Sequence, residues 1–216
     1  MKQPITLVLL GDIAAGKGTQ AEILVKKFDL VLIGTGSFVR KYWTGRSKVS
    51  RQLERTKLGK LAPKDIILKY LGEALTKVSI KKSVLVDGGK MPTEARLIYK
   101  IFTQQKRKIL VIYLTLSHQE IYRRLSWRYY CGRTGKPMTV KTRTKKCPHC
   151  GGPLIKRADD DPKAIKNRID YYDKVYSKTV KFWQGKRLLK KINGKQSVEA
   201  VTKNIVRVIR QYYGAS

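Results

Sequence analysis

The sequence predicts an α/β fold, a five-stranded parallel sheet flanked by helices. Three observations support it. Short apolar runs alternate along the chain with segments whose apolar residues recur every three or four positions, which is the pattern of strands followed by amphipathic helices. The first run, residues 5–10, is apolar throughout and ends in glycine, as expected for a strand covered on both faces. The apolar fraction is 42% over 216 residues, which is enough for one domain with insertions.

Five segments are expected to be strands. They share a short apolar, β-branched composition between turn-forming residues, and they are residues 5–10, 30–33, 84–86, 109–116 and 188–192. Helical segments separate them, so the strands should run parallel with right-handed crossovers. Ligands of such sheets bind at the carboxyl ends of the strands.

The helices carry start signals as well as apolar stripes. Apolar residues at helical spacing follow the first strand, from Ala21 to Phe28. Pro63 is expected at the first position of a second helix, and Ser117 with Glu120 is expected to form a capping box. Further helices should start at Asp161–Pro162 and at Ser197, the last with a stripe of Val198, Val201, Ile205, Val208 and Tyr212. Residues 129–160 lack a helical period and predict a small inserted unit.

A glycine-rich loop, Gly11–Gln20, follows the first strand and leads into a helix. Its glycines allow successive N–H groups to face one anion, and the helix adds its positive end. Lys17 is suited to the β- and γ-phosphates, and the Thr19 hydroxyl to the shell of Mg²⁺. The loop therefore predicts nucleotide binding through the backbone and side chains of Ala14, Ala15, Gly16, Lys17, Gly18 and Thr19, against the alternative of an ordinary glycine-rich turn.

A phosphate loop does not choose between kinases, GTPases and helicases, but further motifs do. The string Gly16–Gln20 resembles adenylate kinases, and other matches follow in the same order along almost the whole chain. They are Thr35–Arg40, Gly59–Ala62, Asp87–Gly88, Arg124 with Arg128, and Arg157–Asp160 with Arg168. The resemblance implies reversible, Mg²⁺-dependent phosphoryl transfer from ATP to AMP, giving two ADP.

The same resemblance implies a P-loop core and two mobile parts. The core would comprise residues 1–35, 66–128 and 161–216. Residues 36–65 would form a helical flap over the monophosphate, and residues 129–160 a small lid over ATP. Closure of both parts would assemble the site only when both substrates are bound, which protects ATP from water.

Site roles follow from the matched motifs. A cage of positive charge would stabilise the moving phosphoryl group, and its members are Lys17, Arg128, Arg157 and Arg168, with Asp159 orienting an arginine. ATP would be held by the phosphate loop with Arg124, Arg128 and Gln196. The monophosphate would meet Thr35, Arg40, Lys60, Leu61, Ala62, Gly88, Lys90, Arg157 and Arg168. Asp87 would hold Mg²⁺ through water. A solvated face for the arginines, and helix capping for Asp159, are the alternatives.

Two departures leave the acceptor base open. Met91 stands where the family usually has an arginine, and Ala95 where it has a glutamine that reads adenine. Lys90 supplies a charge next to the first position. Another monophosphate, or a relaxed acceptor site, is therefore an alternative to AMP. Ser37 and Ala14 also replace the family's usual Asp and Gly.

The inserted unit holds all three cysteines of the chain, Cys131, Cys147 and Cys150. Clustered cysteines in a chain of this kind favour structural zinc, which takes four ligands. His149 is the nearest candidate for the fourth, since Thr134 occupies the position where a second cysteine is usual. A metal-free lid held by polar side chains is the alternative.

The formal net charge is +33, spread along the chain. It indicates an anionic partner or a basic proteome in equal measure, so a basic, nucleic-acid-associated phosphate-loop protein is a second hypothesis, less favoured than the kinase. A kinase that has lost activity and acts as a binder is a third. No apolar run is long enough to span a bilayer and no signal peptide is evident, so we expect a cytoplasmic monomer without membrane contacts.

Overall fold

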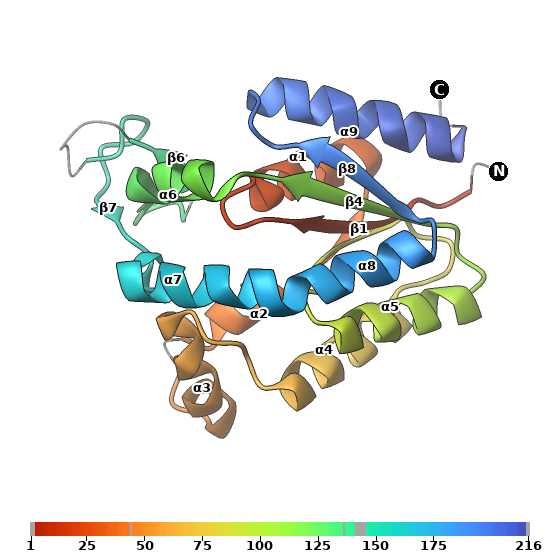
Figure 1. The fold of residues 1–216 in the computed structure, drawn as a ribbon, viewed down its shortest axis with the longest axis horizontal. Coiled ribbons are helices and arrows are strands. Elements are labelled where there is room, and N and C mark those ends of the chain that lie inside the picture. The colour runs from red at the N-terminus through yellow and green to blue at the C-terminus, as the bar shows by residue number, and fades with distance from the viewer. Residues whose placement is uncertain (1–2, 44, 136, 141–145, 215–216) are drawn as a thin grey trace.

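The computed structural model describes residues 3–43, 45–135, 137–140 and 146–214. Five strands form one parallel sheet in the order β2-β3-β1-β4-β8 (Figure 1). They are β1 (Thr6–Gly11), β2 (Val31–Gly34), β3 (Val84–Asp87), β4 (Ile109–Thr115) and β8 (Leu189–Asn193). Each lies within one or two residues of its predicted range, and the predicted α/β class is confirmed.

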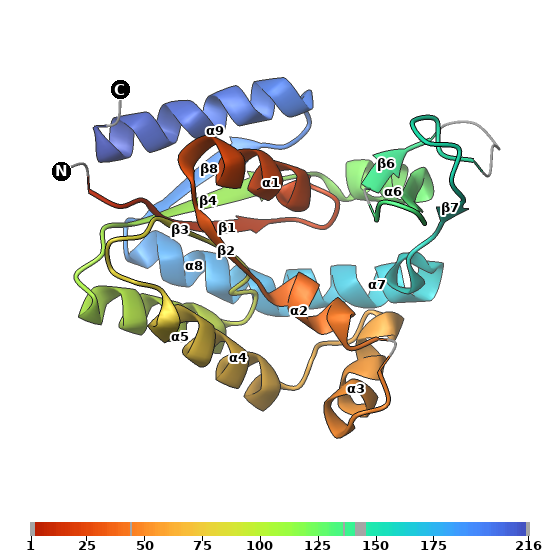
Figure 2. The same ribbon diagram turned by 180° about the vertical axis from the view of Figure 1, so that it is seen from behind.

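Helices cover both faces of this sheet (Figures 1 and 2). On one face lie α1 (Lys17–Phe28) and α9 (Val198–Tyr213), and on the other α4 (Lys64–Lys77), α5 (Pro92–Gln104) and α8 (Ser177–Gly185). Alternate strand residues serve the two faces: Leu7 and Leu9 pack against α1 and α9, whereas Val8 and Leu10 pack against the other three helices. Burial on both sides explains the apolar runs read from the sequence.

Two further units connect the strands. Between β2 and α4 lie α2 (Thr35–Lys41), α3 (Lys48–Leu53) and the 3₁₀ helix η1 (Glu54–Leu58). After α6 (His118–Ser126) comes a small antiparallel sheet, order β6-β5-β7, made of β5 (Arg128–Cys131), β6 (Pro137–Thr139) and β7 (Leu154–Ile155). The chain then returns through η2 (Ala158–Asp160) and α7 (Pro162–Tyr171), and a π-helical turn, η3 (Tyr172–Tyr176), joins α7 to α8.

Three predicted helix starts are confirmed. The side chains of Ser117, Asp161 and Ser197 each accept a backbone N–H from the first turn of their helix, at 3.3, 2.9 and 3.2 Å. Other details of the helix predictions were wrong. Pro63 precedes α4 in extended backbone, with ψ at 133°, instead of occupying its first turn.

Only half of the expected capping box at Ser117 forms, and one residue of the apolar stripe predicted for the last helix is exposed instead of buried. The Glu120 carboxylate binds Arg123 and Arg124 at 2.7 and 2.8 Å, and these ion pairs replace a bond back to the cap. Val198 is 43% exposed because the buried stripe of α9 runs through Val201, Ile205 and Ile209.

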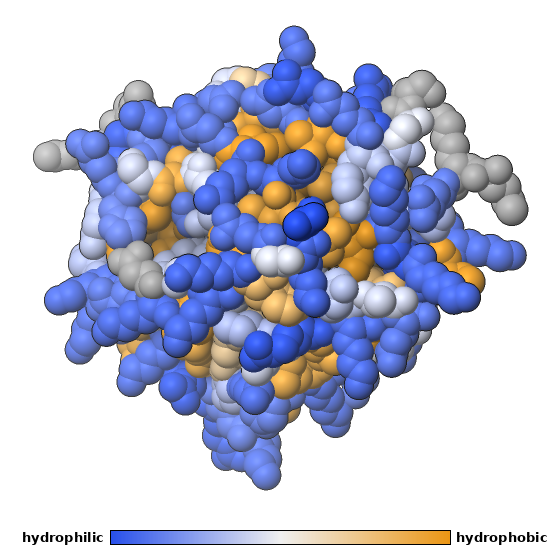
Figure 3. Space-filling model, turned by 45° about the vertical axis from the view of Figure 1, so that its right-hand side comes forward, coloured by the Kyte–Doolittle hydropathy of each residue, from blue (hydrophilic) through white to orange (hydrophobic). Residues whose placement is uncertain are grey.

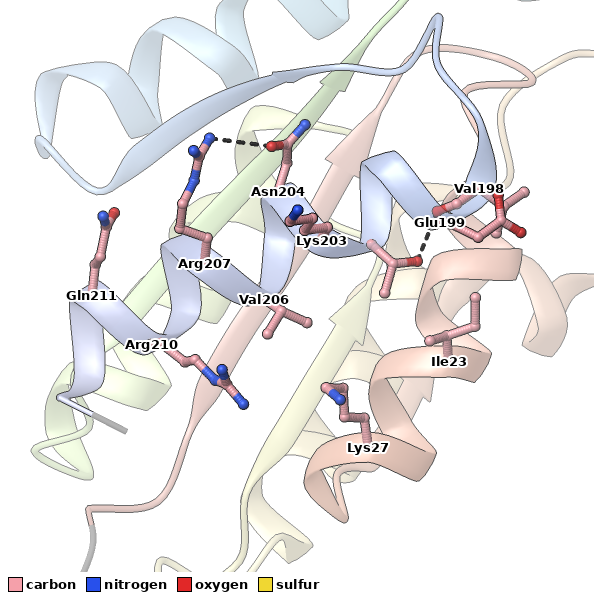
Figure 4. Close-up of a pocket in the computed structure, with 11 residues that line it drawn as sticks. Ile23, Lys27, Val198, Glu199, Lys203, Asn204, Val206, Arg207, Arg210 and Gln211 are labelled. Atoms are coloured by element: carbon pink, nitrogen blue, oxygen red, sulfur yellow. Dashed lines mark hydrogen bonds between the residues drawn. The ribbon is translucent and has the colours of Figure 1, made fainter. Parts of the chain in front are cut away.

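In the view of Figure 3, hydrophilic side chains cover most of the face, and hydrophobic ones lie in the hollows between them. A groove of about 740 Å³ lies between α1 and α9, with apolar Ile23 and Val206 and several cationic side chains along it (Figure 4). None of its lining residues belongs to the loop Gly11–Gly16. No helix in the described part of the chain is both long and apolar enough to cross a membrane.

Candidate active site

The carboxyl edge of the sheet gathers the segments singled out in the sequence. The phosphate loop leaves β1 at Gly11, Thr35 follows β2, Asp87 ends β3, and the turn at Gly194 follows β8. Parallel strands present all these ends at one edge, as expected. The site is therefore a consequence of topology, because its parts are far apart in the sequence.

The phosphate loop curls through two left-handed residues. Gly16 has φ of 87° and precedes the first turn of α1 with no side chain capping that turn, so the helix N-terminus faces the loop. Ala14 has φ of 58°, a conformation that favours glycine. The family's usual glycine at this position, absent here, thus has a conformational reason, and Ala14 bears local strain instead.

Lys17 folds over its own loop. Its Nζ donates to the carbonyl oxygens of Gly11 at 2.6 Å and Asp12 at 2.9 Å. Burial of the ammonium lowers the pKa of Lys17 to about 7, an effect that nearby Asp87 opposes. The side chain is poised where the loop's N–H groups converge, and it is only partly charged at neutral pH.

Asp12 is a structural residue of the site that sequence reasoning missed. Its carboxylate accepts the Tyr113 hydroxyl at 2.5 Å and the Leu116 N–H at 2.6 Å, which fixes the loop to the end of β4. Burial, with the hydrogen bond to Asp12, raises the pKa of Tyr113, so the phenol stays a neutral donor. No local motif marks Asp12, since its partners lie more than 100 residues away along the chain.

Three predicted arginines meet around two aspartates. Arg128 binds the Asp160 carboxylate through Nε at 2.8 Å and through a second, very short contact. Arg157 binds Asp159 at 2.5 Å, and Arg168 reaches the carboxylates of Asp159 at 3.3 Å and Asp160 at 3.4 Å. Arg128 begins β5 of the small antiparallel sheet, whereas Arg157 and Arg168 follow the sheet in the chain. The structure brings the three together, and their role as phosphate ligands stays a prediction.

The two aspartates orient different arginines: Asp159 binds Arg157 and Arg168, and Asp160 binds Arg128 and Arg168. Although burial disfavours the charge, Arg168 and Arg157 hold the pKa of Asp159 below its usual value. Asp160, whose side chain is fully buried, was missed by sequence reasoning because it reads as one of three consecutive acidic residues. Arg157 Nε and Asp159 Oδ1 are buried without a hydrogen-bond partner among the described residues, so both atoms can still take a ligand.

Arg124 and Gln196 lie on the other side of the phosphate loop. The Arg124 guanidinium donates to the carbonyls of Ala14 at 3.2 Å and Gly194 at 2.8 Å, and binds Glu120 at 2.8 Å. It thereby fixes the loop to the turn after β8. Gln196 belongs to that same turn and donates to the Asn193 carbonyl at 2.9 Å. The structure brings these two predicted ATP ligands to one turn.

The predicted acceptor side is built around Thr35 and Gly88. Thr35 is buried at the start of α2, and its hydroxyl lies 3.5 Å from the Asp87 carbonyl. A Cβ added at Gly88 would lie 2.7 Å from the Thr35 methyl, so this approach requires glycine. Desolvation and the Arg157 charge lower the pKa of Arg40, which places that guanidinium in the same electrostatic neighbourhood.

Lys90 and Glu94 directly precede the two departures from the family motif, Met91 and Ala95. Burial lowers the pKa of Lys90, and Asp87 opposes this effect. The Glu94 carboxylate accepts the Lys90 N–H at 2.7 Å. Met91 precedes α5, and Ala95 is fully buried against the core, so Ala95 does not face a nucleotide.

The turn before α4 contributes less direct contact. Lys60 is exposed, Leu61 is half-buried, and Ala62 packs against the core. Gly59 has φ of 73°, and a Cβ there would lie 2.2 Å from the Ala164 carbonyl on α7. With Lys60 exposed and Ala62 packed on the core, the monophosphate contacts expected of Lys60, Leu61 and Ala62 stay a prediction.

The three cysteines meet in the small sheet. The sulfur atoms of Cys131, Cys147 and Cys150 all lie within 4.8 Å of one another, with 3.3 Å between Cys131 and Cys150. Tetrahedral zinc separates thiolates by about 3.8 Å, so the spacing fits. Hydrogen bonds from the Thr134 side chain and N–H lower the pKa of Cys131 to about 6. His149 is exposed and does not join this group among the described residues.

Comparison with known proteins agrees with this geometry. A family model described as adenylate kinase matches residues 9–188. The adenylate kinase of Lactobacillus helveticus is 33% identical over 213 residues, which cover 95% of this chain and 98% of that protein. Those of Clostridium acetobutylicum and Methanothrix thermoacetophila are 26% and 28% identical, and the matches cover 94% and 96% of this chain and 98% and 100% of theirs.

Proposed function

The chain belongs to the adenylate kinase family and is a nucleoside monophosphate kinase, and we propose that the residues gathered at the carboxyl edge of its sheet transfer the terminal phosphoryl group of ATP to AMP. The observation that carries the proposal is the convergence of Arg128, Arg157 and Arg168 around two aspartates, with the Arg168 charge close enough to the phosphate loop to lower the pKa of Lys17. Phosphoryl transfer requires positive charge and positioning more than covalent chemistry, and this cluster supplies both.

On the ATP side, the N–H groups of Ala14–Thr19 cradle the phosphates, and the Lys17 ammonium leaves the carbonyls of Gly11 and Asp12 to contact them. Arg124 and Gln196 hold the nucleoside end beside the Gly194 turn. The Asp87 carboxylate and the Thr19 hydroxyl suit the hydrated shell of Mg²⁺, because hard oxygen donors are its preferred ligands. Mg²⁺ would neutralise phosphate charge there.

On the acceptor side, Thr35, Arg40, Gly88 and Lys90 bind the monophosphate, with Lys60, Leu61 and Ala62 along the wall. Arg157 and Arg168 then contact the phosphate that moves, and Asp159 keeps them oriented. Arg128 completes the cage from the other end of the lid, held by Asp160. Guanidinium groups suit this task, since they bind phosphate through two parallel N–H donors.

Two mobile parts would exclude water. We assign residues 1–35, 66–128 and 161–216 to the core, residues 36–65 to the monophosphate flap, and residues 129–160 to the lid. The position of the arginines supports this division. They lie at the two ends of the lid, so they would meet the phosphates together only when the lid is closed. A cytoplasmic location, a monomeric state and any nucleic-acid binding through the +33 charge stay predictions.

The lid is proposed to hold structural zinc. Cys131, Cys147 and Cys150 would supply three thiolates, and their spacing fits a tetrahedral ion. The ion would cross-link β5 to the Cys147–Cys150 turn, giving rigidity to a unit with little core of its own. His149, predicted as a candidate fourth ligand, lies exposed outside the group.

The test is a coupled assay of ADP formation with ATP, Mg²⁺ and each of AMP, GMP, CMP, UMP and dTMP. AMP is expected to turn over at least as fast as the others, because the family model and the similar proteins are adenylate kinases. A faster reaction with another monophosphate would overturn AMP as acceptor and leave the cage intact. No turnover with any of them would contradict the proposal and give weight to the basic surface.

A further inference from the structure

A π-helical turn interrupts the long helix that returns from the lid. The turn η3, Tyr172–Tyr176, lies between α7 and α8 below the sheet in Figure 1. Such turns are rare, occur mostly as single insertions inside α-helices, and are frequent at functional sites. This one lies one turn after Arg168, at the level of the phosphate loop.

Two tyrosines of the turn form hydrogen bonds with both backbone groups of Gly11, the first residue of the phosphate loop. The Gly11 N–H donates to the Tyr176 hydroxyl at 2.8 Å, and the Tyr172 hydroxyl donates to the Gly11 carbonyl at 2.9 Å. The two rings pack with centroids 4.4 Å apart. Burial raises the pKa of both phenols, so they stay neutral at physiological pH.

Two other side chains, on either side of the turn, form hydrogen bonds with Lys90, in the segment Gly88–Lys90 assigned to the monophosphate and called the acceptor segment below. The Lys90 carbonyl accepts the Tyr171 hydroxyl at 3.2 Å and the Thr179 hydroxyl at 2.9 Å. Thr179 is fully buried. One short stretch of helix thus contacts both the ATP-binding loop and the segment assigned to the monophosphate.

The π turn explains how this is geometrically possible. Residues eight apart in a regular α-helix, such as Tyr171 and Thr179, face directions about 80° apart. One inserted residue makes eight positions span about two full turns, so the two side chains come into line on one carbonyl.

We propose that Tyr171, Tyr172, Tyr176 and Thr179 are positioning residues, and that this turn, the π clamp, sets the placement of the ATP loop and the acceptor segment relative to Arg168. The proposal rests on the nucleotide sites assigned above. The π clamp acts through backbone groups of Gly11 and Lys90, which accept or donate the hydrogen bonds of all four side chains.

Tyr172 has a particular part in ATP binding. The Gly11 carbonyl accepts from both Lys17 Nζ, at 2.6 Å, and the Tyr172 hydroxyl. When Lys17 turns to a phosphate, Tyr172 is left as the donor to that carbonyl. Without the Tyr172 hydroxyl, ATP has to draw Lys17 away from a carbonyl that then loses its last donor, which costs affinity.

The π clamp is tested with Tyr172→Phe and Tyr171→Phe, which keep the rings and remove one hydroxyl each. Dissociation constants for ATP alone and for AMP alone are measured by calorimetry on the full chain. Loss of one hydrogen bond corresponds to about a fivefold change in affinity. Tyr172→Phe is expected to raise the dissociation constant of ATP about fivefold and to leave that of AMP nearly unchanged. Tyr171→Phe is expected to raise the dissociation constant of AMP about fivefold and to leave that of ATP nearly unchanged.

Tyr212→Phe is the matched control. It removes a similar phenol-to-carbonyl bond, 2.7 Å to Ile109, at the opposite edge of the sheet. It should lower thermal stability as much as the other two without changing either affinity. Provided that the wild type binds both nucleotides, two results would overturn the π clamp. One is that each variant weakens ATP binding and AMP binding equally. The other is that neither variant changes either affinity more than Tyr212→Phe does. Wild type that binds neither nucleotide would instead overturn the proposed function.

Discussion

Burial sets the charge of Lys17 in the phosphate loop. The motif identifies this lysine, but its proximity to Gly11 and Asp12 carbonyls and its desolvation emerge only in three dimensions. Its pKa of about 7 lies below the usual 10.5. Between these two values the unfolded chain holds a proton that the folded chain has lost, so this group makes stability rise with pH across that window.

Nucleotide affinity should depend on pH in the opposite sense. Only protonated Lys17 attracts phosphate, so we expect the dissociation constant of ATP to increase as pH rises above about 7, by up to about tenfold per pH unit. Calorimetric titrations between about pH 6 and 9 measure this slope. Lys17→Arg, which stays charged throughout, should remove most of it. An equal slope in both proteins would show that Lys17 does not titrate in this range.

Other site residues show what sequence could and could not provide. Lys17, Arg157 and Arg168 were found because motifs name them and topology gathers them. Asp12 and Asp160 were missed, because their partners are remote in the sequence and a single aspartate carries no signal. The left-handed backbone of Ala14 was equally hidden, since only the loop geometry demands it.

Among the elements, strands and capped helices were predicted well for a physical reason. Strands buried on both faces leave continuous apolar runs, and Ser and Asp caps precede apolar stripes. The three strands of the lid were not predicted, because β6 and β7 have three and two residues and no apolar alternation. The π turn leaves no pattern in composition, since its extra residue becomes visible only through its partners.

Metal removal tests the lid as an element. We expect about one zinc per chain by atomic absorption. A chelator should lower the melting temperature by roughly 5–10 °C, which corresponds to about 2–3 kcal/mol in a chain of this size. The reason is that the three thiolates would cross-link β5 to the turn Cys147–Cys150 in a unit that buries little apolar surface.

Cys147→Ser is the control, because it removes one buried ligand and keeps the turn. It should bind no zinc and show no response to the chelator. Wild type that holds no zinc and melts at one temperature with or without chelator would favour the metal-free lid, held by hydrogen bonds such as Cys147 N–H to Gly152 O at 2.7 Å.

For the whole molecule, the +33 charge opposes folding through self-repulsion. Cations gather even around the groove of Figure 4, where Lys27, Lys203, Arg207 and Arg210 share one lining with a single Glu199. The fold class could be read from the sequence, yet the function of this charge could not, because a basic surface looks alike whether it binds an anion or not.

Salt should therefore stabilise the protein. Raising NaCl from about 20 to about 200 mM shortens the Debye length from about 20 to about 7 Å, and we expect the melting temperature to rise by roughly 3–6 °C. A triple variant, Lys27→Glu, Lys203→Glu and Arg210→Glu, should gain less, because it starts with less repulsion. A melting temperature that falls with salt would mean that ion pairs outweigh repulsion.

The central claim is that the arginine cluster at the carboxyl edge of the sheet catalyses phosphoryl transfer. Its most direct test is the steady-state rate of ADP formation from ATP and AMP by the variant Arg168→Lys. Arg207→Lys is the control, because Arg207 is an exposed residue of α9. Lysine keeps the charge and loses the planar fork, so kcat of Arg168→Lys should fall about 100-fold or more with unfolding temperature unchanged. The control should match wild type. If Arg168→Lys also keeps the wild-type kcat, the cluster is not the catalytic apparatus.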